Sequence, residues 1–238
     1  MSSVVEQAFT ELAPSYVDTM DHELKEYWGV GYREFVSRLV ASASIRPGEM
    51  VLDIATGTAI IPLEIIGKTN SWDPVVGLDI TPAMLRQGHK YIQEKGKPFL
   101  ITLVCASAME MPFKEGAFNV AVCGLGTHHM EVPRMLSEVK RVLAKGGRLV
   151  ITDVGASAFW RSRAGKLLLK LLLLRYGLLQ GSARAEAEIE AFKNVRTADE
   201  WRDLLAEYGF TEISVTEHRA RRPWYPCALT LTAELGTQ

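Results

Sequence analysis

The sequence has few of the residues that mark exported, disulfide-bonded or membrane-spanning proteins. Its 238 residues include three cysteines, Cys105, Cys123 and Cys227, which form no CxxC pair and are odd in number. We therefore expect neither a disulfide framework nor a metal site, and a reducing cytoplasm is the expected location. The first residues, MSSVVEQAFTEL, lack the basic start and apolar core of a signal peptide, and no apolar run is long enough to span a bilayer.

The chain also lacks an excess of charge of either sign. Lys and Arg number 27 and Asp and Glu number 28, so no overall basic field indicates a nucleic-acid partner and no acidic excess indicates disorder. A small basic and aromatic stretch, RRPWYP at 221–226, lies between two expected strands and is interpreted as a turn. A surface that follows a phosphate backbone would be more extensive, so no nucleic acid is expected as a partner.

What the sequence does contain is an alternation of short apolar runs and helix-length segments. The runs MVLDI, VVGLDI, FLITLVCA, FNVAVCGL and RLVITDV predict a parallel sheet with helices on both faces. TEISVTEHRA and CALTLTAEL are too close together for a crossover helix and predict an antiparallel hairpin at the edge of the sheet. We expect a single α/β domain over 1–238, with seven strands and with helical cap elements at 1–44 and 156–195.

Helix boundary signals agree with this alternation. Thr81 followed by Pro82 predicts a helix start, and Thr197 with Glu200 predicts a capping box before WRDLLAEY. Gly146 and Gly209 are expected to end helices.

Three successive expected strands end in residues suited to binding a nucleoside with an amino-acid-like end. The first ends in Asp53 followed by the small turn Ala55-Thr56-Gly57, where backbone N–H groups can approach a ligand. The second ends in Asp79, whose carboxylate can accept from vicinal ribose hydroxyls, and the third leads into the loop 106–109, where Ser107 can accept from an exocyclic amine. Each feature taken singly is equally compatible with a structural role. The prediction of a nucleoside site depends on their occurrence together, one at each of three successive strand ends.

The chain resembles the class I S-adenosylmethionine-dependent methyltransferases over essentially its whole length. The matching stretches are VLDIATGTA, VVGLDITPAMLRQGHK, SAMEMPFKEGAFNVAVCGLGTHH and EVKRVLAKGGRLVITDV. They are most similar to the branch that includes the ubiquinone and menaquinone C-methyltransferases. The resemblance implies a Rossmann-like fold, S-adenosyl-L-methionine as cofactor and S-adenosyl-L-homocysteine as product.

The resemblance also implies which residues hold this cofactor. Asp53 and the Ala55–Gly57 turn would hold its methionine end, Asp79 its ribose, and Ile80 its adenine, with Gly124 and Leu125 near the methionyl group. The remaining implied contacts are Tyr16, Met84, Ser107, Ala108 and Met109. The chain departs from the family pattern at Ala59, where the last glycine of the turn is usual, and at Ser107, where an acidic residue is usual.

The acceptor is expected to be a small molecule, and its chemistry is less constrained than that of the cofactor. His128 and His129, in GLGTHHM, are candidate catalytic bases because imidazole can take a proton near neutral pH, although packing or capping is an equally simple role. The segment RSRAGKLLLKLLLLRYGLL places Arg163, Lys166 and Lys170 on one stripe of a leucine-rich helix. It can be a buried cap or homodimer helix, the wall of an apolar acceptor pocket, or a peripheral membrane contact through 163–179.

These leucines favour a lipophilic acceptor such as a quinone-, phenol- or polyketide-like ring, and leave open transfer to carbon, oxygen or nitrogen. Three other functions compete with methyl transfer. A nicotinamide-dependent oxidoreductase would need GxGxxG, and ATGTAI has one glycine. A non-catalytic S-adenosylmethionine-binding protein or a cyclase that retains the cofactor would share nearly all the same residues.

Overall fold

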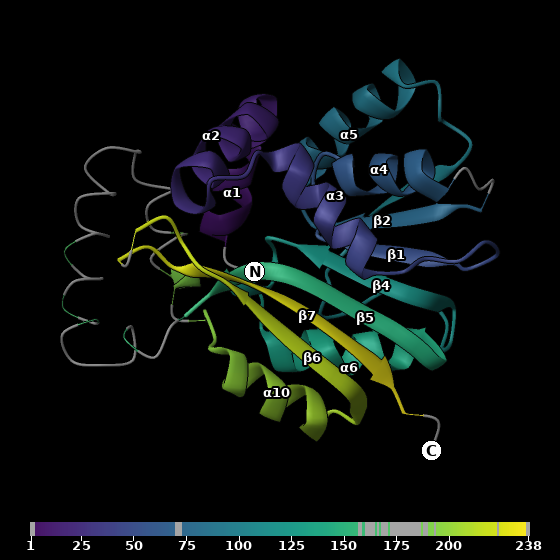
Figure 1. Ribbon diagram of the computed structural model, residues 1–238. Coiled ribbons are helices and arrows are strands. Elements are labelled where there is room, and N and C mark those ends of the chain that lie inside the picture. Colours follow the sequence, from purple (N-terminus) through teal and green to yellow (C-terminus); the bar gives the residue numbers. More distant parts are fainter. Residues whose placement is uncertain are drawn as a thin grey trace.

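The computed structural model describes residues 3–69, 73–156, 190–192, 194–222 and 224–236, together with positions 159, 165, 167, 171 and 187. These residues form a seven-stranded sheet in the order β3-β2-β1-β4-β5-β7-β6 (Figure 1). The strands are β1 (Val51–Ile54), β2 (Val75–Asp79), β3 (Ile101–Cys105), β4 (Phe118–Gly124), β5 (Leu143–Gly155), β6 (Phe210–His218) and β7 (Cys227–Leu235). β1 to β5 are parallel, and β7 is antiparallel to both β5 and β6. The predicted mostly parallel sheet with an antiparallel hairpin at its edge is confirmed.

Helices cover both faces of this sheet. The helical elements are α1 (Ser3–Leu12), η1 (Ala13–Ser15), α2 (Tyr16–Trp28), α3 (Tyr32–Ser42), α4 (Ile60–Thr69), α5 (Pro82–Glu94), η2 (Thr127–His129), α6 (Val132–Val142) and α10 (Ala198–Glu207). Helices α3, α4 and α5 pack on one face, and α6 and α10 pack on the other (Figure 1). Residues 3–42 are almost entirely helical, as the sequence predicted.

The strand sequences explain the two cores. Successive side chains of a strand point to opposite faces, so Val51 joins the core under α3, α4 and α5, while Leu52 and Ile54 join the core under α6 and α10. All four residues of β1 are buried, as expected for a central strand of a parallel sheet covered on both sides. Asp53 is therefore a carboxylate inside an otherwise apolar layer.

Most of the helix boundary signals are confirmed. Thr197 and Glu200 form the predicted capping box, and Thr81 precedes α5 with proline in the first turn. Gly209 follows α10 in the left-handed conformation, with φ +85°. The expectation for Gly146 was wrong: α6 ends at Val142, and Gly146 lies within β5 with φ +72°. It falls in the irregular stretch between the pairings of Leu143 and Arg148 with β4.

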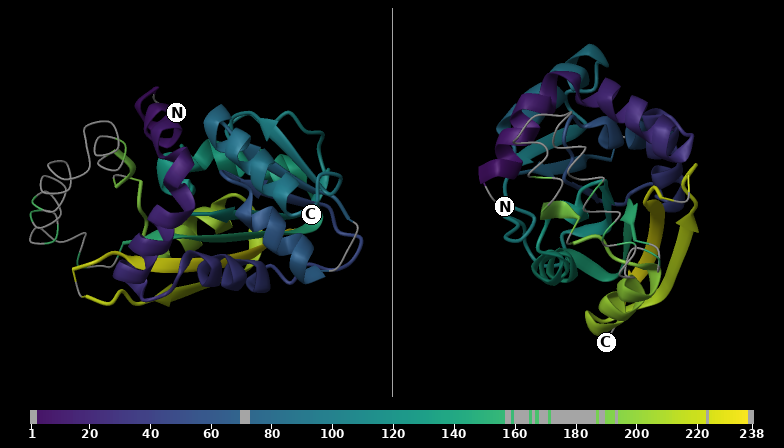
Figure 2. Two further views of the ribbon diagram at one scale, coloured as in Figure 1. Left: turned by 90° about the horizontal axis from the view of Figure 1, so that it is seen from above. Right: turned by 90° about the vertical axis from the view of Figure 1, so that its left-hand side faces the viewer.

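The first two helices form an N-terminal cap, residues 3–28, at the end of the sheet where the parallel strands end. Figures 1 and 2 show α1 and α2 beside this end, away from the loops that precede the strands. The connection between β6 and β7 packs against α2, because the Arg221 N–H donates to the Tyr27 carbonyl at 2.8 Å and the Tyr225 hydroxyl donates to Glu26 at 2.8 Å. The stretch RRPWYP thus joins two strands and supports the cap.

The segment 156–195 lies largely outside the described residues, so its predicted roles in acceptor binding, dimer formation and membrane contact remain predictions. Two of its described positions, Ala187 and Ala191, are buried, and Ala187 packs against Val5 and Ala8 of α1. Leu167 and Leu171 are exposed. Among the described helices, none combines the length and the hydropathy needed to cross a membrane.

Candidate functional site

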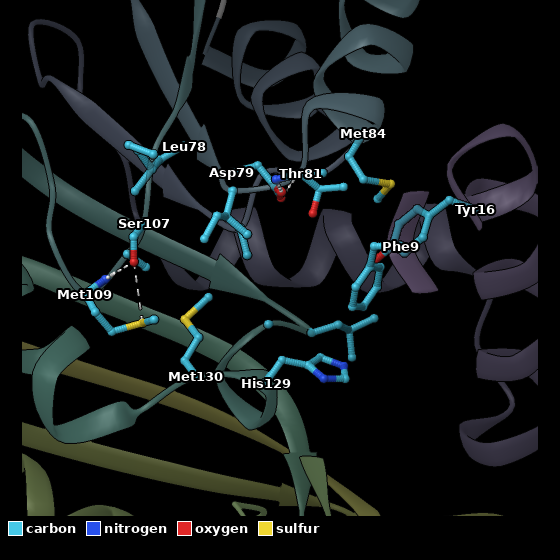
Figure 3. A pocket seen from close by; sticks show the side chains of 17 residues that line it. Phe9, Tyr16, Leu78, Asp79, Thr81, Met84, Ser107, Met109, His129 and Met130 are labelled. Atoms are coloured by element: carbon cyan, nitrogen blue, oxygen red, sulfur yellow. Dashed lines mark hydrogen bonds between the residues drawn. The ribbon is translucent and has the colours of Figure 1, made fainter. Parts of the chain in front are cut away.

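A pocket opens where β1, β2, β3 and β4 lead into their loops, beneath the N-terminal cap (Figure 3). Its wall consists of Phe9, Tyr16, Ala55, Gly57, Leu78, Asp79, Ile80, Thr81, Met84, Ala106, Ser107, Ala108, Met109, Leu125, Gly126, His129 and Met130. This wall includes ten of the thirteen residues that the sequence predicted for the cofactor site. The other three, Asp53, Thr56 and Gly124, are not part of the wall.

Asp79 lies at the end of β2 and connects two loops of the pocket. Its Oδ2 accepts from the Gly57 N–H at 2.9 Å, and its Oδ1 accepts from the Thr81 N–H at 2.8 Å (Figure 3). Burial raises the pKa of Asp79 above its usual value, while the bonds from Thr81 and Gly57 act in the opposite direction. Each carboxylate oxygen has a second lone pair, so the group can still accept from two neighbouring hydroxyls.

The turn after β1 is unusually tight. Ala55, Gly57 and Ala59 all adopt the left-handed conformation, with φ of 57°, 53° and 61°. This conformation costs an alanine about 1–2 kcal/mol, so the surrounding contacts must enforce it. A Cβ at Gly57 would lie 3.0 Å from the Met84 Cε, so a larger residue would narrow the pocket at this point. Small residues therefore keep the backbone accessible to a ligand.

Asp53 lies directly before this turn and is fully buried. Neither of its carboxylate oxygens, nor the Thr56 hydroxyl, has a hydrogen bond of normal geometry within the described chain. Burial raises the pKa of Asp53 to about 8. A buried carboxylate without a partner is costly unless it is protonated or neutralised by a cation. The site is thus suited to a ligand that brings a positive group to the turn.

The third predicted strand end contributes the loop after β3. The Met109 N–H donates to the Ser107 Oγ at 3.1 Å, and the Ala106 N–H donates to the Asp79 carbonyl at 3.1 Å. Ser107 therefore shapes its own loop, and its hydroxyl can also take part in a further hydrogen bond. Ala108 and Met109 complete this side of the wall.

The N-terminal cap closes the pocket with aromatic rings. Tyr16, at the start of α2, is buried, and its ring lies 5.9 Å from that of Tyr32 at a nearly perpendicular angle. Burial raises the pKa of Tyr16 well above its usual value, so its hydroxyl stays protonated. Phe9 of α1 lies between this ring and His129, with centroid distances of 6.5 and 5.1 Å (Figure 3).

The loop after β4 contributes Leu125 and Gly126 to the wall, whereas Gly124, the last residue of β4, is not part of it. Leu125 lines the pocket in the left-handed conformation, with φ +56°, and its N–H donates to the Thr152 carbonyl at 3.0 Å. A Cβ at Gly124 would lie 2.8 Å from the Ile61 Cδ1, so this glycine allows close packing against α4. Gly124 was predicted to lie near the cofactor, but it does not line the pocket.

The two candidate bases have different surroundings. His129 lines the pocket, whereas His128 is buried beside β5. The His128 Nδ1 lies 2.6 Å from the Asp153 Oδ1, and the two imidazole rings have centroids 4.2 Å apart. Only His129 is thus placed to contact a molecule in the pocket.

Sequence reasoning did not assign Phe9, Met130 or Asp153 to this region. Asp153 could have been found, because it is a carboxylate at the end of a parallel strand, as Asp53 and Asp79 are. Phe9 and Met130 have no comparable signal, since their place on the wall depends on how α1 and the loop after η2 pack. No group of three metal-binding side chains occurs in the part of the chain that the structure describes.

These features fit the cofactor that the sequence resemblance implies. Asp79 would take the ribose hydroxyls, the Ala55–Gly57 turn with Asp53 would take the charged amino-acid end, and Ile80 with Met84 would provide apolar surface for the base. Asp53 is a buried carboxylate directly before this turn and is not part of the pocket wall, so its contact with the ammonium group of a ligand remains a prediction.

Known sequences that are similar to this chain are methyltransferases. The sequence profile of the ubiE/COQ5 methyltransferase family matches residues 2–219. The chain is 28% identical over 225 residues to a demethylmenaquinone methyltransferase of Symbiobacterium thermophilum, a match that covers 87% of this chain and 85% of that protein. It is 28% identical over 240 residues to a ubiquinone/menaquinone biosynthesis C-methyltransferase UbiE of Geobacter sulfurreducens, covering 98% of this chain and 88% of the relative.

Solved structures with low sequence identity share the fold. The [4+2]-cyclase SpnF superposes with a TM-score of 0.71 at 16% identity and covers 99% of this chain and 93% of its own. A geranyl diphosphate methyltransferase in complex with SAM gives a TM-score of 0.67 at 12% identity, covering 85% and 84% of the two chains. Taken with the profile match over nearly the whole sequence, these findings show that the chain belongs to the ubiE/COQ5 methyltransferase family and is an S-adenosylmethionine-dependent methyltransferase.

Proposed function

We propose that this methyltransferase places a methyl group on a ring carbon of a hydroquinone with an apolar substituent. The observation that carries the proposal is the wall around His129, where an imidazole stands among Phe9, Leu125 and Met130. An aromatic acceptor fits such apolar surface, and the imidazole can exchange a proton with its hydroxyl group. The names of the two relatives, a demethylmenaquinone methyltransferase and a ubiquinone/menaquinone C-methyltransferase, support a quinone-type acceptor and transfer to carbon.

The bound cofactor supplies a methyl group attached to a positively charged sulfur. The chain's own contribution is to hold this group and the acceptor at a fixed distance in a site from which water is excluded. Phe9 and Tyr16 serve the second purpose, because their rings cover the mouth of the pocket between the cap and the strand ends. Asp79 and the Ala55–Gly57 turn serve the first purpose, because they hold the cofactor in place in this proposal.

His129 acts as the base in this proposal. A hydroquinone hydroxyl is a weak acid, like the phenol of tyrosine, and the ring carbon becomes a strong nucleophile when the hydroxyl loses its proton. His129 accepts this proton, and the ring carbon then takes the methyl group as the bond from carbon to sulfur breaks. The methylated carbon next loses its hydrogen as a proton and the oxygen regains one, so the ring is again an aromatic hydroquinone and one proton in net passes to water. The oxidised quinone has no hydroxyl proton to lose and an electron-poor ring, so only the reduced form is a substrate.

The test is methyl transfer from S-adenosylmethionine to a reduced naphthoquinone lacking its ring methyl group, with the oxidised quinone, a simple phenol and an amine as comparison acceptors. We expect turnover with the hydroquinone, and the new methyl group on carbon by NMR. Transfer to oxygen or nitrogen, or equal turnover of the oxidised quinone, contradicts the proposal. Calorimetric titration with S-adenosylhomocysteine shows separately that the cofactor site is intact.

A further inference from the structure

The turn that carries His129 is held by a buried carboxylate at the end of β5. The Asp153 Oδ2 accepts from the Thr127 N–H at 2.7 Å, from the Thr127 hydroxyl and from the His128 N–H at 3.3 Å. Its Oδ1 lies 2.6 Å from the His128 Nδ1 and accepts from the Val154 N–H at 2.7 Å. Asp153 thus fixes both the backbone of η2 and one of its two imidazole rings.

The Asp153 side chain is ionised in this setting. Burial raises its pKa, but the charge of His128 and the hydrogen bonds from His128, Thr127 and Val154 more than offset this effect, so the pKa lies below its usual value. Within the described residues its ion-pair partner is His128, and the two side chains are 2% and 10% exposed. A buried carboxylate of this kind stabilises a proton on the imidazole next to it.

The second ring of the pair lies close enough for a charge on one ring to disfavour a charge on the other. The His128 and His129 centroids are 4.2 Å apart, a distance at which two positive imidazoles repel each other strongly in a buried site. Within the described ranges, Tyr16 of α2 and Cys123 of β4 are titratable groups that also feel the Asp153 charge. Burial raises the pKa of both, so they remain neutral and do not compete for the charge.

We propose that Asp153 is a positioning residue that keeps the proton of the histidine pair on His128 and leaves the His129 imidazole neutral at the pocket wall. A neutral imidazole is the form that can accept a proton from an acceptor hydroxyl. The role of His129 as a base rests on the function proposed above. Which of the two histidines carries the proton does not depend on the acceptor.

The substitution Asp153→Asn separates charge from shape. Three donors point at Oδ2 and one, the Val154 N–H, points at Oδ1, so the amide oxygen should occupy the Oδ2 position. The amide NH₂ should then face the His128 Nδ1, and the bond from the Val154 N–H is lost. An NH₂ group donates and cannot hold a proton on Nδ1, so His128 would become neutral with its proton on Nε2. Repulsion between the rings would then disappear, and His129 could become protonated.

The experiment is ¹⁵N NMR of the histidine rings in the full chain at pH 7, with S-adenosylhomocysteine bound and no acceptor present. His128→Gln and His129→Asn assign the two signals, and Asp203→Asn on exposed α10 is the matched control. In the wild type we expect His128 protonated on both nitrogens and His129 neutral. In Asp153→Asn we expect His128 to lose one proton, and in Asp203→Asn no change.

A neutral His128 or a protonated His129 in the wild type overturns the proposal, and so does a His128 that stays doubly protonated in Asp153→Asn. If Asp153→Asn does not fold, the wild-type spectrum alone decides. In turnover with a hydroquinone, Asp153→Asn should lower kcat about 100-fold while the Kd of S-adenosylhomocysteine stays within twofold, and an unchanged kcat also overturns the proposal. If the wild type shows no hydroquinone turnover, the proposed function fails, and the spectrum still decides the protonation order.

Discussion

The two sides of the pocket are built in different ways. The strand side, Ala55, Gly57, Asp79 and Ser107, lies at the ends of strands or in the loops that follow them. Asp79 accepts from the Gly57 N–H of the neighbouring loop, and Ser107 accepts from the Met109 N–H of its own loop. The cap side, Phe9, Tyr16, His129 and Met130, comes from elements outside the sheet, and its aromatic side chains meet through ring contacts. Hydrogen bonds at strand ends fix a rigid shape, whereas ring contacts from a separate cap allow the wall to vary. We infer from this comparison that the strand side serves the cofactor and that the cap side mainly serves the acceptor.

Of the substitutions considered, His129→Asn should show the largest difference between the cap side and the strand side of the pocket, because it should change turnover and leave cofactor binding intact. The substitution keeps a polar side chain but removes the base, so kcat with a hydroquinone should fall by about 100-fold or more. The Kd of S-adenosylhomocysteine, measured by calorimetry, should stay within twofold. His89→Asn, on the exposed face of α5, is the control. A large loss of cofactor affinity in His129→Asn would show that the cap side also serves the cofactor.

Asp53 should make the stability of the cofactor-free chain depend on pH. Its pKa is about 8 in the folded chain and about 4 in an unfolded one, so the folded state binds the extra proton between these values. Stability should therefore fall as pH rises from about 4 to about 8. Urea unfolding at pH 5 and pH 8 should show a loss of the order of a few kcal/mol in the wild type and a smaller loss in Asp53→Asn. Equal losses in both proteins would mean that Asp53 ionises normally in the folded chain.

Phe9→Ala tests the cap side through packing alone. The ring is partly buried between Tyr16 and His129, and its removal should open the pocket to water and remove apolar contact with the acceptor. We expect KM for the hydroquinone to rise about 10-fold, which corresponds to about 1.4 kcal/mol of lost contact. Cofactor affinity should change less. Phe99→Ala, at a position that is 95% exposed, should leave both constants unchanged.

Ala55→Gly should have the smallest effect and acts on the strand side. Glycine adopts the left-handed conformation found at Ala55 without steric cost, so the substitution should relieve about 1 kcal/mol of strain. For a chain of this size we expect Tm to rise by about 2–4 °C, measured by differential scanning calorimetry. A lower Tm would show that the Ala55 methyl group contributes more through packing than its backbone costs.

Much of the fold and of the strand side could be predicted from the sequence. The strands end where apolar runs end, and three polar strand ends, Asp53, Asp79 and Ser107, follow one another in the predicted order. The error at Gly146 arose because a glycine after a helix also suits the turn at the start of a long strand.

The cap side could not be predicted to the same extent. Phe9 and Tyr16 look like ordinary residues of amphipathic helices, and their place on the wall depends on the packing of α1 and α2 over the strand ends. The two adjacent histidines could not be told apart by sequence, since they differ in two features of the fold. His129 lines the pocket, and His128 is buried beside Asp153.

The division of the pocket can be tested directly by titrating S-adenosylhomocysteine into the wild type and Asp79→Asn by calorimetry. The amide keeps the shape of the side chain but removes the negative charge and replaces one acceptor oxygen. The variant therefore loses a hydrogen bond to the ribose together with the bond from either the Gly57 or the Thr81 N–H. We predict that Kd rises by about 10- to 100-fold in Asp79→Asn, while thermal unfolding shows that the variant is folded. An unchanged Kd in the folded variant would contradict the assignment of the strand side to the cofactor.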